Sequence, residues 1–229
     1  MISLKSLCRR IPLIYPLWHS IRVKNNERKE RSKKHSFDKY GMEVLDDIYK
    51  VINKYDYKVI CAFGTLLGII RDDRLLPWDD DHDFLILDDG SFSWKEFDSA
   101  MIEGGFKLYR EFEEEGKVVE KSYRKKGVLC DIRIWEDYQM DHVIHEDYFE
   151  LPEVEYINGK YCEYETILKS YKAIKEVKTY SFKGVNVKIP ENCDEFFEAA
   201  YGPGWKTPDP DWKPKEERIR IMRKATYFR

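Results

Sequence analysis

Hydrophobic positions recur along the chain with two periods, and each period predicts a different kind of element. Over residues 37–54 apolar side chains return every three or four positions, so we expect an amphipathic helix there. The short apolar run at residues 59–63 predicts a buried strand, which Gly64 and Thr65 interrupt. Residues 65–71 have the composition of a second, shorter helix. A helix, a strand and a helix are therefore expected before the acidic middle section.

The rest of the sequence alternates between strand-like and helix-like patterns. A Gly-Gly pair at residues 104–105 and a proline at position 190 mark the ends of two elements, whereas residues 161–177 show no clear period. The further elements that we expect are strands at 82–87, 106–112, 117–124 and 128–135, helices at 94–103 and 192–200, and a hairpin at 180–189 with its turn at Lys183-Gly184. Because no regular β-α-β rhythm emerges, the pattern favours an α+β fold with a mixed sheet.

The length and charge of the chain indicate one main domain with two basic ends. A chain of 229 residues with 42% hydrophobic and 36% charged residues can bury a sizeable core as a soluble globular protein. Residues 1–35 hold ten of the 40 Lys and Arg but only two of the 43 Asp and Glu, so the body is acidic. We expect a basic arm at 1–35, a globular domain at 36–215 and a basic tail at 216–229. Four prolines between positions 203 and 214 indicate an extended segment that wraps the body.

The N-terminal arm mixes apolar and basic residues. No run of about eighteen apolar residues occurs in the sequence, and Arg9, Arg10, Pro12 and Pro16 interrupt the apolar part of the arm. The arm suits the surface of an anionic membrane, and an ordinary arm packed on the domain is the alternative. Five cysteines without a C-x-x-C pair fit a reducing compartment. We therefore expect a cytoplasmic protein, peripheral on the inner face of the cytoplasmic membrane, whose acidic body disfavours nucleic acid as a partner.

Four aspartates fall within residues 78–83, directly before the apolar run 84–87. Like charges and burial both disfavour the ionised carboxylate, so the cluster needs a cation or hydrogen bonds to stay ionised. Oxygen ligands of this kind suit Mg²⁺ or Mn²⁺, and a solvated acidic turn is the alternative. In a strand, Asp81 and Asp83 project from one face and His82 from the other. A metal site is therefore expected at Asp81 and Asp83.

Two other segments carry groups that could complete such a site. Asp131 lies within the apolar strand at 128–135 and is favoured as a third ligand, the alternative being an edge position paired with Arg133. Gly64 and Thr65 stand between a strand and a helix N-terminus, where backbone N–H groups bind phosphate, although such a pair also serves as a plain turn and cap. No G-x-x-x-x-G-K-[ST] sequence occurs, which excludes a P-loop enzyme.

Three segments together resemble the LicD family, which includes fukutin and fukutin-related protein. The first is AFGTLLGIIRDDRLLPWDDDHDFLI at residues 62–86, which resembles the family pattern G-T-L-L-G, then Arg, then P-W-D-D-D-x-D. His82 replaces the usual apolar residue between the last two aspartates. The second segment is CDIRIW around Asp131, and the third consists of Phe182, Gly184, Pro190, Tyr201, Gly202 and Trp205. The resemblance covers about residues 40–210.

The resemblance implies a nucleotidyltransferase-like fold, a mixed sheet flanked by helices, with residues 36–215 as the catalytic domain. It also implies transfer of a phospho-alcohol, such as phosphocholine or ribitol phosphate, from a CDP-activated alcohol to a hydroxyl of a cell-surface glycan or lipid-linked oligosaccharide. By this resemblance Asp81, Asp83 and Asp131 hold Mg²⁺ or Mn²⁺ on the donor diphosphate. Asp131 would also lie near the acceptor hydroxyl as its base.

Further substrate contacts are expected from five residues. Gly64 and Thr65 would cradle phosphate, and Arg71 would neutralise its charge, with a plain helix C-terminal cation as an equal alternative for Arg71. Asp80 would bind substrate or contact a nearby arginine, and Trp205 belongs either to the donor-site wall or to the core. Two other functions stay open: nucleotidyl transfer to a small molecule, and metal or glycan binding without catalysis on the same fold.

Overall fold

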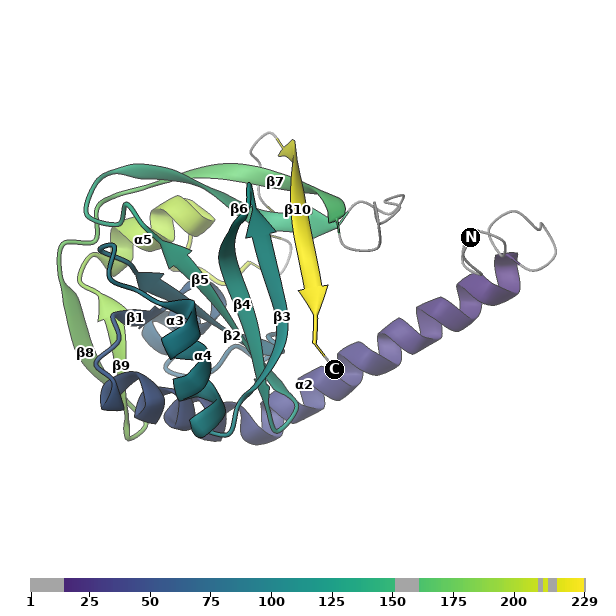
Figure 1. Cartoon of the computed structure of the whole chain (residues 1–229), viewed down its shortest axis with the longest axis horizontal. Helices are drawn as coiled ribbons and strands as arrows, with labels where there is room; N and C mark the ends of the chain where they lie inside the picture. Colours follow the sequence, from purple (N-terminus) through teal and green to yellow (C-terminus); the bar gives the residue numbers. More distant parts are fainter. Residues whose placement is uncertain (1–14, 151–160, 210–211, 214–217, 229) are drawn as a thin grey trace.

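An eight-stranded mixed sheet runs through the molecule, with helices packed around it (Figure 1). The structure is a computed structural model that describes residues 15–150, 161–209, 212–213 and 218–228. The strands of this sheet, in spatial order, are β1 (Val59–Cys61), β2 (Asp81–Leu87), β5 (Val128–Trp135), β4 (Lys117–Lys125), β3 (Lys107–Glu114), β10 (Arg218–Tyr227), β7 (Tyr161–Tyr171) and β6 (His142–Glu150). The helices are α2 (Tyr15–Lys54), α3 (Phe63–Arg71), α4 (Trp94–Glu103) and α5 (Cys193–Tyr201), and β8 (Val177–Phe182) pairs with β9 (Val185–Pro190) in a separate hairpin. The α+β prediction is confirmed.

Strands β2 and β5 form the one parallel pair among the described strands, and the other pairings are antiparallel. Parallel neighbours need a long crossover, which here consists of α4, β3 and β4. The acidic segment at the start of β2 therefore lies beside the strand that carries Asp131. At the β8–β9 turn, Lys183 and Gly184 have φ angles of 47° and 89°, as a two-residue hairpin turn of type I′ requires.

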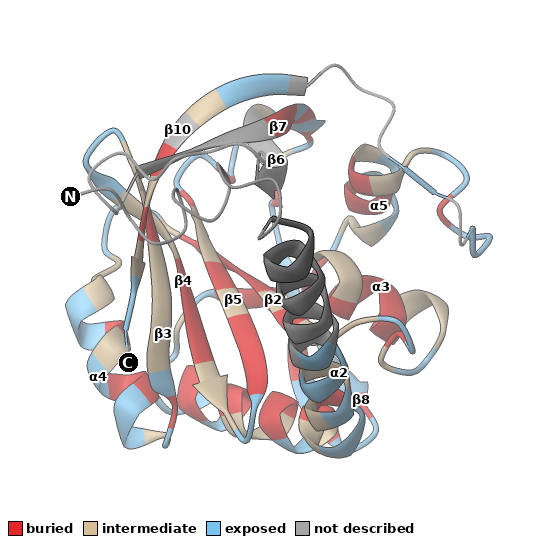
Figure 2. Cartoon of the chain, turned by 90° about the vertical axis from the view of Figure 1, so that its right-hand side faces the viewer, coloured by how far each residue is buried: buried red, intermediate tan, exposed pale blue. Residues whose placement is uncertain are grey.

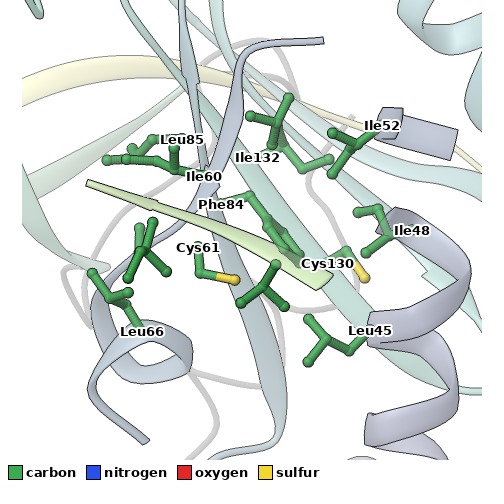
Figure 3. Close-up of a cluster of buried hydrophobic side chains, with 14 of the residues drawn as sticks. Leu45, Ile48, Ile52, Ile60, Cys61, Leu66, Phe84, Leu85, Cys130 and Ile132 are labelled. Carbon is green, nitrogen blue, oxygen red and sulfur yellow. The ribbon is translucent and has the colours of Figure 1, made fainter. Parts of the chain in front are cut away.

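The main hydrophobic core lies between the C-terminal half of α2 and strands β1, β2 and β5 (Figure 3). Leu45, Ile48 and Ile52 of α2 are fully buried, in agreement with their helical spacing. Phe84 of β2 and Ile132 of β5 are buried in the same cluster. Figure 2 shows that buried positions dominate β2 and β5. These two strands are therefore held firmly by the helix, which fixes the position of the acidic residues that they carry.

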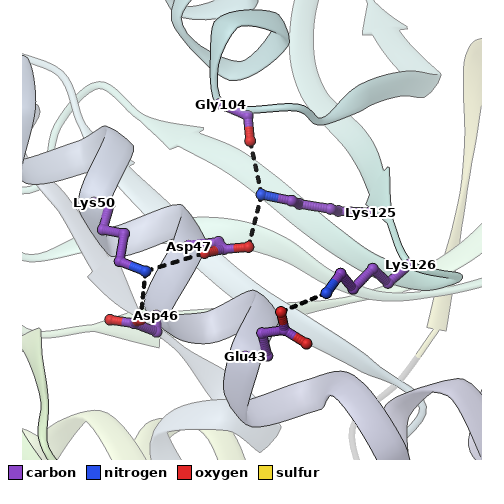
Figure 4. A network of polar contacts seen from close by, with 7 residues as sticks. All are labelled: Glu43, Asp46, Asp47, Lys50, Gly104, Lys125 and Lys126. Atoms are coloured by element: carbon purple, nitrogen blue, oxygen red, sulfur yellow. Dashed lines mark hydrogen bonds and ion pairs between the residues drawn. The ribbon is translucent and has the colours of Figure 1, made fainter.

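Polar contacts join α2 to the turn between β4 and β5 (Figure 4). Lys125 Nζ donates to the Gly104 carbonyl at 2.8 Å and lies 2.6 Å from Asp47 Oδ2 of α2. Lys126 pairs with Glu43 of the same helix. Partly exposed ion pairs add little stability individually. These contacts join α2 to the end of β4 and to the end of α4.

The helix expected at residues 37–54 is longer in the structure, because α2 spans Tyr15–Lys54. Residues 24–36 carry no apolar stripe, so hydrophobic spacing does not reveal them, although Lys, Arg and Glu are good helix formers. Figure 1 shows that the first half of α2 extends away from the body. Residues 1–14 of the predicted basic arm lie outside the described residues. Across the part of the chain that the structure describes, we find no helix both long and apolar enough to cross a membrane.

The C-terminal segment differs from the tail expected at 216–229, because it contributes β10 to the middle of the sheet. β10 pairs antiparallel with β3 on one side and with β7 on the other. Its sequence, RIRIMRKATY, has basic residues at many positions and resembles an exposed tail. Pairing on both sides buries Arg223 and Ala225 all the same. The sheet therefore extends beyond the boundary expected at residue 215.

Candidate active site

One face of the sheet carries a row of polar side chains that crosses five neighbouring strands. Asp83 of β2 is opposite Asp131 of β5, which is opposite Ser122 of β4. The row continues through Arg110 of β3 to Tyr227 of β10. Residues that are directly opposed in a sheet point to the same face, so strands far apart in sequence present these groups together. The structure thus brings Asp83 and Asp131 side by side.

A cavity of about 580 Å³ lies against this row and has a mixed charged and aromatic wall. Its acidic residues are Asp79, Asp83, Glu120 and Asp131, its basic residues are Arg110, Arg133 and Arg223, and its aromatic residues are Phe63, Trp78, Phe84, Phe112, Tyr201 and Tyr227. A volume of this size suits a small-molecule ligand. The cavity therefore marks the candidate active site, and it includes Gly64, Asp83 and Asp131 of the predicted site residues.

Burial and mutual repulsion raise the pKa values of the carboxyl groups on β2 and β5. Burial and then the charge of Asp131 raise the pKa of Asp81 well above its usual range. Burial and then the charge of Asp81 do the same to the pKa of Asp83. Burial also raises the pKa of Asp131, and the nearby Arg110 guanidinium opposes that shift. Ionising all three carboxyl groups together is therefore costly unless a cation joins them.

The surroundings of Asp131 fit a hard divalent cation. Arg110 Nη2 donates to Asp131 Oδ2 at 3.1 Å, and Arg110 Nε donates to Ser122 Oγ at 3.1 Å. The other oxygen, Oδ1, is buried and accepts no hydrogen bond from the described residues. An unpartnered carboxylate oxygen beside two mutually repelling carboxyl groups is the donor set that Mg²⁺ or Mn²⁺ prefers. In the described part of the chain no three acidic, His or Cys side chains already surround one point that could hold a metal, so binding an ion would require these side chains to turn.

Gly64 allows the carboxylate of Asp79 to lie against the start of α3. A Cβ atom on Gly64 would be 2.6 Å from Asp79 Oδ2, so only glycine leaves room for that side chain in its present position. Burial and then the charge of Asp80 raise the pKa of Asp79 to about 6. Gly64 and Asp79 both line the cavity. Gly64 therefore borders the cavity next to Asp79, and its predicted contact with phosphate stays a prediction.

Thr65 and His82 hold β2 from behind the site. Thr65 is buried, and its Oγ1 accepts a hydrogen bond from the Asp83 backbone N–H at 2.9 Å. Burial lowers the pKa of His82 to about 4, so its imidazole is neutral at pH 7. His82 Nε2 lies 2.9 Å from the Gly41 carbonyl and carries the proton, which leaves Nδ1 to accept from Thr65 at 3.4 Å. Thr65 thus positions Asp83 and does not line the cavity, in contrast to the phosphate contact expected from the sequence.

Three other predicted substrate contacts also lie away from the cavity wall. Arg71 donates from Nε and Nη2 to Asp72, at 2.7 and 3.1 Å, and from Nη1 to the Trp205 carbonyl at 3.2 Å. Trp205 is buried in the main core. Asp80 lies 3.5 Å from Lys33 Nζ of α2. These contacts join the end of α3 to the loop after α5 and the acidic segment to α2.

Most of the cavity wall outside the acidic motif consists of residues that were not predicted from the sequence. Arg133 had a detectable signal, because it stands two positions after Asp131 and so shares its face in a strand. Trp78, a residue of the acidic motif, is 60% exposed and lines the cavity. The other charged or polar lining residues that we did not predict are Arg110, Glu120, Arg223 and Tyr227. They lie on β3, β4 and β10, and the sequence alone does not show that these strands follow one another beside β5 in the sheet.

The fold and the acidic face define a nucleotidyltransferase-type domain, with a mixed sheet that presents carboxyl groups to one cavity. Residues 57–192 match the family model described as LicD/FKTN/FKRP, nucleotidyltransferase domain. This match covers more than half of the 229 residues, so the chain belongs to the LicD family. The family is one of transferases of the phosphotransferase type. A search of curated proteins finds no match.

Proposed function

We propose that the protein is a metal-dependent transferase that moves a phospho-alcohol, such as phosphocholine or ribitol phosphate, from a CDP-activated donor to a hydroxyl group of a glycan or lipid-linked oligosaccharide. The observation that carries this proposal is the in-register pair Asp83 and Asp131, with the unpartnered Asp131 Oδ1, in a cavity that also holds three arginines. Phosphoryl transfer depends mainly on positioning and on neutralising charge, and this wall offers groups for both.

We assign Asp81, Asp83 and Asp131 as the residues that hold Mg²⁺ or Mn²⁺. When bound, the ion would neutralise the diphosphate of the donor and polarise the phosphorus that is attacked. Support comes from the raised pKa values of all three carboxyl groups, because a divalent cation removes the repulsion behind these shifts. Arg133 shares the face of Asp131 and supplies additional positive charge for the phosphate oxygens.

In the proposed reaction the acceptor oxygen forms a bond to the phosphorus that carries the alcohol. The bond from this phosphorus to the bridging oxygen breaks, and cytidine monophosphate leaves with the electron pair. We assign Asp131 as the group that takes the proton of the acceptor hydroxyl, because its carboxylate lies in the cavity wall beside the proposed metal site. Arg110 holds the other oxygen of Asp131 and so orients the base.

The test is to incubate the protein with Mg²⁺, a glycan acceptor and a panel of CDP-alcohols and nucleotide sugars, and to measure release of cytidine monophosphate. We expect release from a CDP-alcohol that EDTA abolishes and that Asp83→Asn or Asp131→Asn reduces at least about 100-fold. Asp89→Asn is the matched control, because Asp89 is exposed just beyond β2 and should have no effect. Release of pyrophosphate from CTP instead would indicate nucleotidyl transfer, and metal binding without turnover of any donor would indicate a binding domain.

We also propose that the protein contacts the inner face of the cytoplasmic membrane through its basic arm. Ten Lys and Arg against two Glu in residues 1–35 would attract anionic lipid headgroups. The first half of α2, which carries the described part of this arm, extends away from the body (Figure 1). Such a location would suit a lipid-linked acceptor, and we do not assign nucleic acid as a partner.

A further inference from the structure

Strand β10 brings two residues, Arg223 and Tyr227, into the wall of the candidate active site. The strand lies outside residues 57–192, the part that matches the family model. It pairs with β3, the strand that carries Arg110, and places Tyr227 opposite Arg110. This segment therefore contributes to the site although the family motif does not contain it.

Arg223 is one of the most deeply buried charged residues among those described, with only 1% of its surface exposed. Its Nε lies 3.0 Å from Glu114 Oε1, and its Nη2 donates to Glu120 Oε2 at 3.2 Å. The planar guanidinium thus joins a carboxylate of β3 to one of β4. The fork of N–H donors on the guanidinium directs separate bonds to the two carboxylates at once.

The Arg223 contacts continue directly to Asp131. Glu120 Oε1 lies 4.0 Å from Arg110 Nη2, which is the atom that donates to Asp131 Oδ2 at 3.1 Å. The Phe112 ring makes a second connection, because the guanidinium groups of Arg110 and Arg223 lie 4.5 and 4.2 Å from its centroid. A cation near an aromatic ring at this distance is attracted to it. Arg110 is therefore held through both Glu120 and Phe112.

A buried network of charged groups contributes little to the net stability of a fold. Taking several charges out of water costs about as much free energy as their mutual attraction returns, and apolar residues of similar volume often stabilise a protein equally well. The network ends, however, on Asp131, whose Oδ1 is buried without a hydrogen-bond partner among the described residues. Its position is better explained by a requirement of the site than by the stability of the sheet.

We propose that Arg223 is a positioning residue: through Glu120 and Phe112 it holds Arg110 in the orientation that fixes Asp131. This inference rests on the proposed function, in which Asp131 serves the transfer. Arg223 acts through Arg110, so β10 contributes a residue that serves the transfer without contacting the reacting atoms itself.

The test compares Arg223→Gln with Arg220→Gln, a matched control three positions earlier on the same strand, where Arg220 is exposed. We expect Arg223→Gln to lower kcat about 10- to 100-fold, while the KM for the donor and the calorimetric Kd for CDP change by less than about threefold. Arg220→Gln should match the wild type. Glu120→Gln, which breaks the same link while keeping the arginine, provides a second variant and should also lower kcat with little change in KM.

A double-mutant cycle with Arg110→Gln decides whether Arg223 acts through Arg110. We expect the double variant to be no slower than Arg110→Gln alone; independent effects that multiply would overturn the inference. A rise in KM at constant kcat would also overturn it, by making Arg223 a substrate contact.

Crystal structures of the two single variants at positions 223 and 220 give a readout that needs no turnover. We expect the hydrogen bond from Arg110 to Asp131 to be lost in Arg223→Gln and kept in Arg220→Gln, and an intact bond in both would contradict the positioning role. Absence of turnover in the wild type would count against the proposed function only, because the structural comparison still decides the role of Arg223.

Discussion

At the scale of residues, Asp83 has a carboxyl group whose ionisation is opposed both by burial and by the charges of neighbouring carboxylates. Its pKa lies well above the usual range, because burial and the charges of Asp81 and Asp131 disfavour its anion. Between the unfolded pKa near 4 and the higher folded pKa, the folded state binds more protons than the unfolded chain. The contribution of this group to stability is therefore most favourable at low pH, and it falls as the pH rises through this window.

We predict that metal-free Asp83→Asn is more stable than the wild type at pH 7.5, and that the difference disappears at pH 4 and below. Each unit of pKa shift corresponds to about 1.4 kcal/mol, so a gain of at least about 1 kcal/mol is expected at pH 7.5. Urea unfolding in EDTA at pH 4, 5.5 and 7.5 measures the difference. Asp89 is the control, because its contact with Lys58 lowers its pKa to about 2, so Asp89→Asn should not stabilise the protein. A wild type more stable than Asp83→Asn at pH 7.5 would contradict the prediction.

Gly64 is a second residue whose identity is restricted by its surroundings, because a Cβ atom there would clash with Asp79. A methyl group at this position would meet Asp79 Oδ2 at 2.6 Å and displace that carboxylate in the cavity wall. We predict that Gly64→Ala lowers turnover at least about tenfold while destabilising the fold by no more than about 2 kcal/mol, because a side chain can move more easily than the backbone. Gly204→Ala is the matched control, since nothing lies within 4 Å of a Cβ there. Activity equal to the wild type in Gly64→Ala would show that the Asp79 position is unimportant.

At the scale of elements, α2 lies before the residues that match the family model. Its Ile48 is fully buried against the sheet, within the cluster of Figure 3. We predict that Ile48→Ala costs about 2 to 5 kcal/mol in the free energy of unfolding, as expected for a buried aliphatic side chain. Ile102→Ala on α4, where the side chain is 61% exposed, should change stability by less than about 0.5 kcal/mol. Equal effects of the two variants in urea unfolding would mean that α2 is not part of the cooperative domain.

The elements that could be predicted from the sequence are those whose pattern is local. The amphipathic half of α2, the short strand β1 and the β8–β9 hairpin all carry their own periodicity or turn residues, and the structure contains each of them. Strand β10 and the first half of α2 were not recognised because both are rich in charge, and their structure depends on neighbours or on helix propensity.

The candidate site divides in the same way. The alternation of Asp81 and Asp83 and the apolar context of Asp131 were sufficient to predict that these residues share a face. In the structure, the register of β2 and β5 places Asp83 opposite Asp131. The roles of Thr65 and Arg71 were harder to predict, because a hydroxyl or guanidinium near a motif can serve the backbone as readily as a ligand. Arg110 and Arg223 were not predicted at all, since their proximity to Asp131 arises only when β3 and β10 join the sheet.

At the scale of the whole molecule, the charge is divided between a basic arm and an acidic body. We predict that the protein floats with vesicles that contain phosphatidylserine but not with pure phosphatidylcholine, and that 0.5 M salt releases it. Because each basic residue near such a surface contributes about 1 kcal/mol, neutralising four of them should weaken binding at least about 100-fold. The test variant replaces Arg9, Arg10, Arg22 and Lys24 by Gln, and the control variant replaces Lys172, Lys178, Lys183 and Lys206 by Gln. Equal loss in both variants would contradict a specific role of the arm.

The central claim is that the carboxyl groups of β2 and β5 form a site for a divalent cation. The most direct measurement is a titration with Mn²⁺ followed by electron paramagnetic resonance, which reports free and bound ion without knowledge of the donor. We expect the wild type and Asp89→Asn to bind Mn²⁺ with the same affinity, and Asp83→Asn and Asp131→Asn to bind at least about tenfold more weakly. Unchanged Mn²⁺ binding in both Asp83→Asn and Asp131→Asn would contradict the claim.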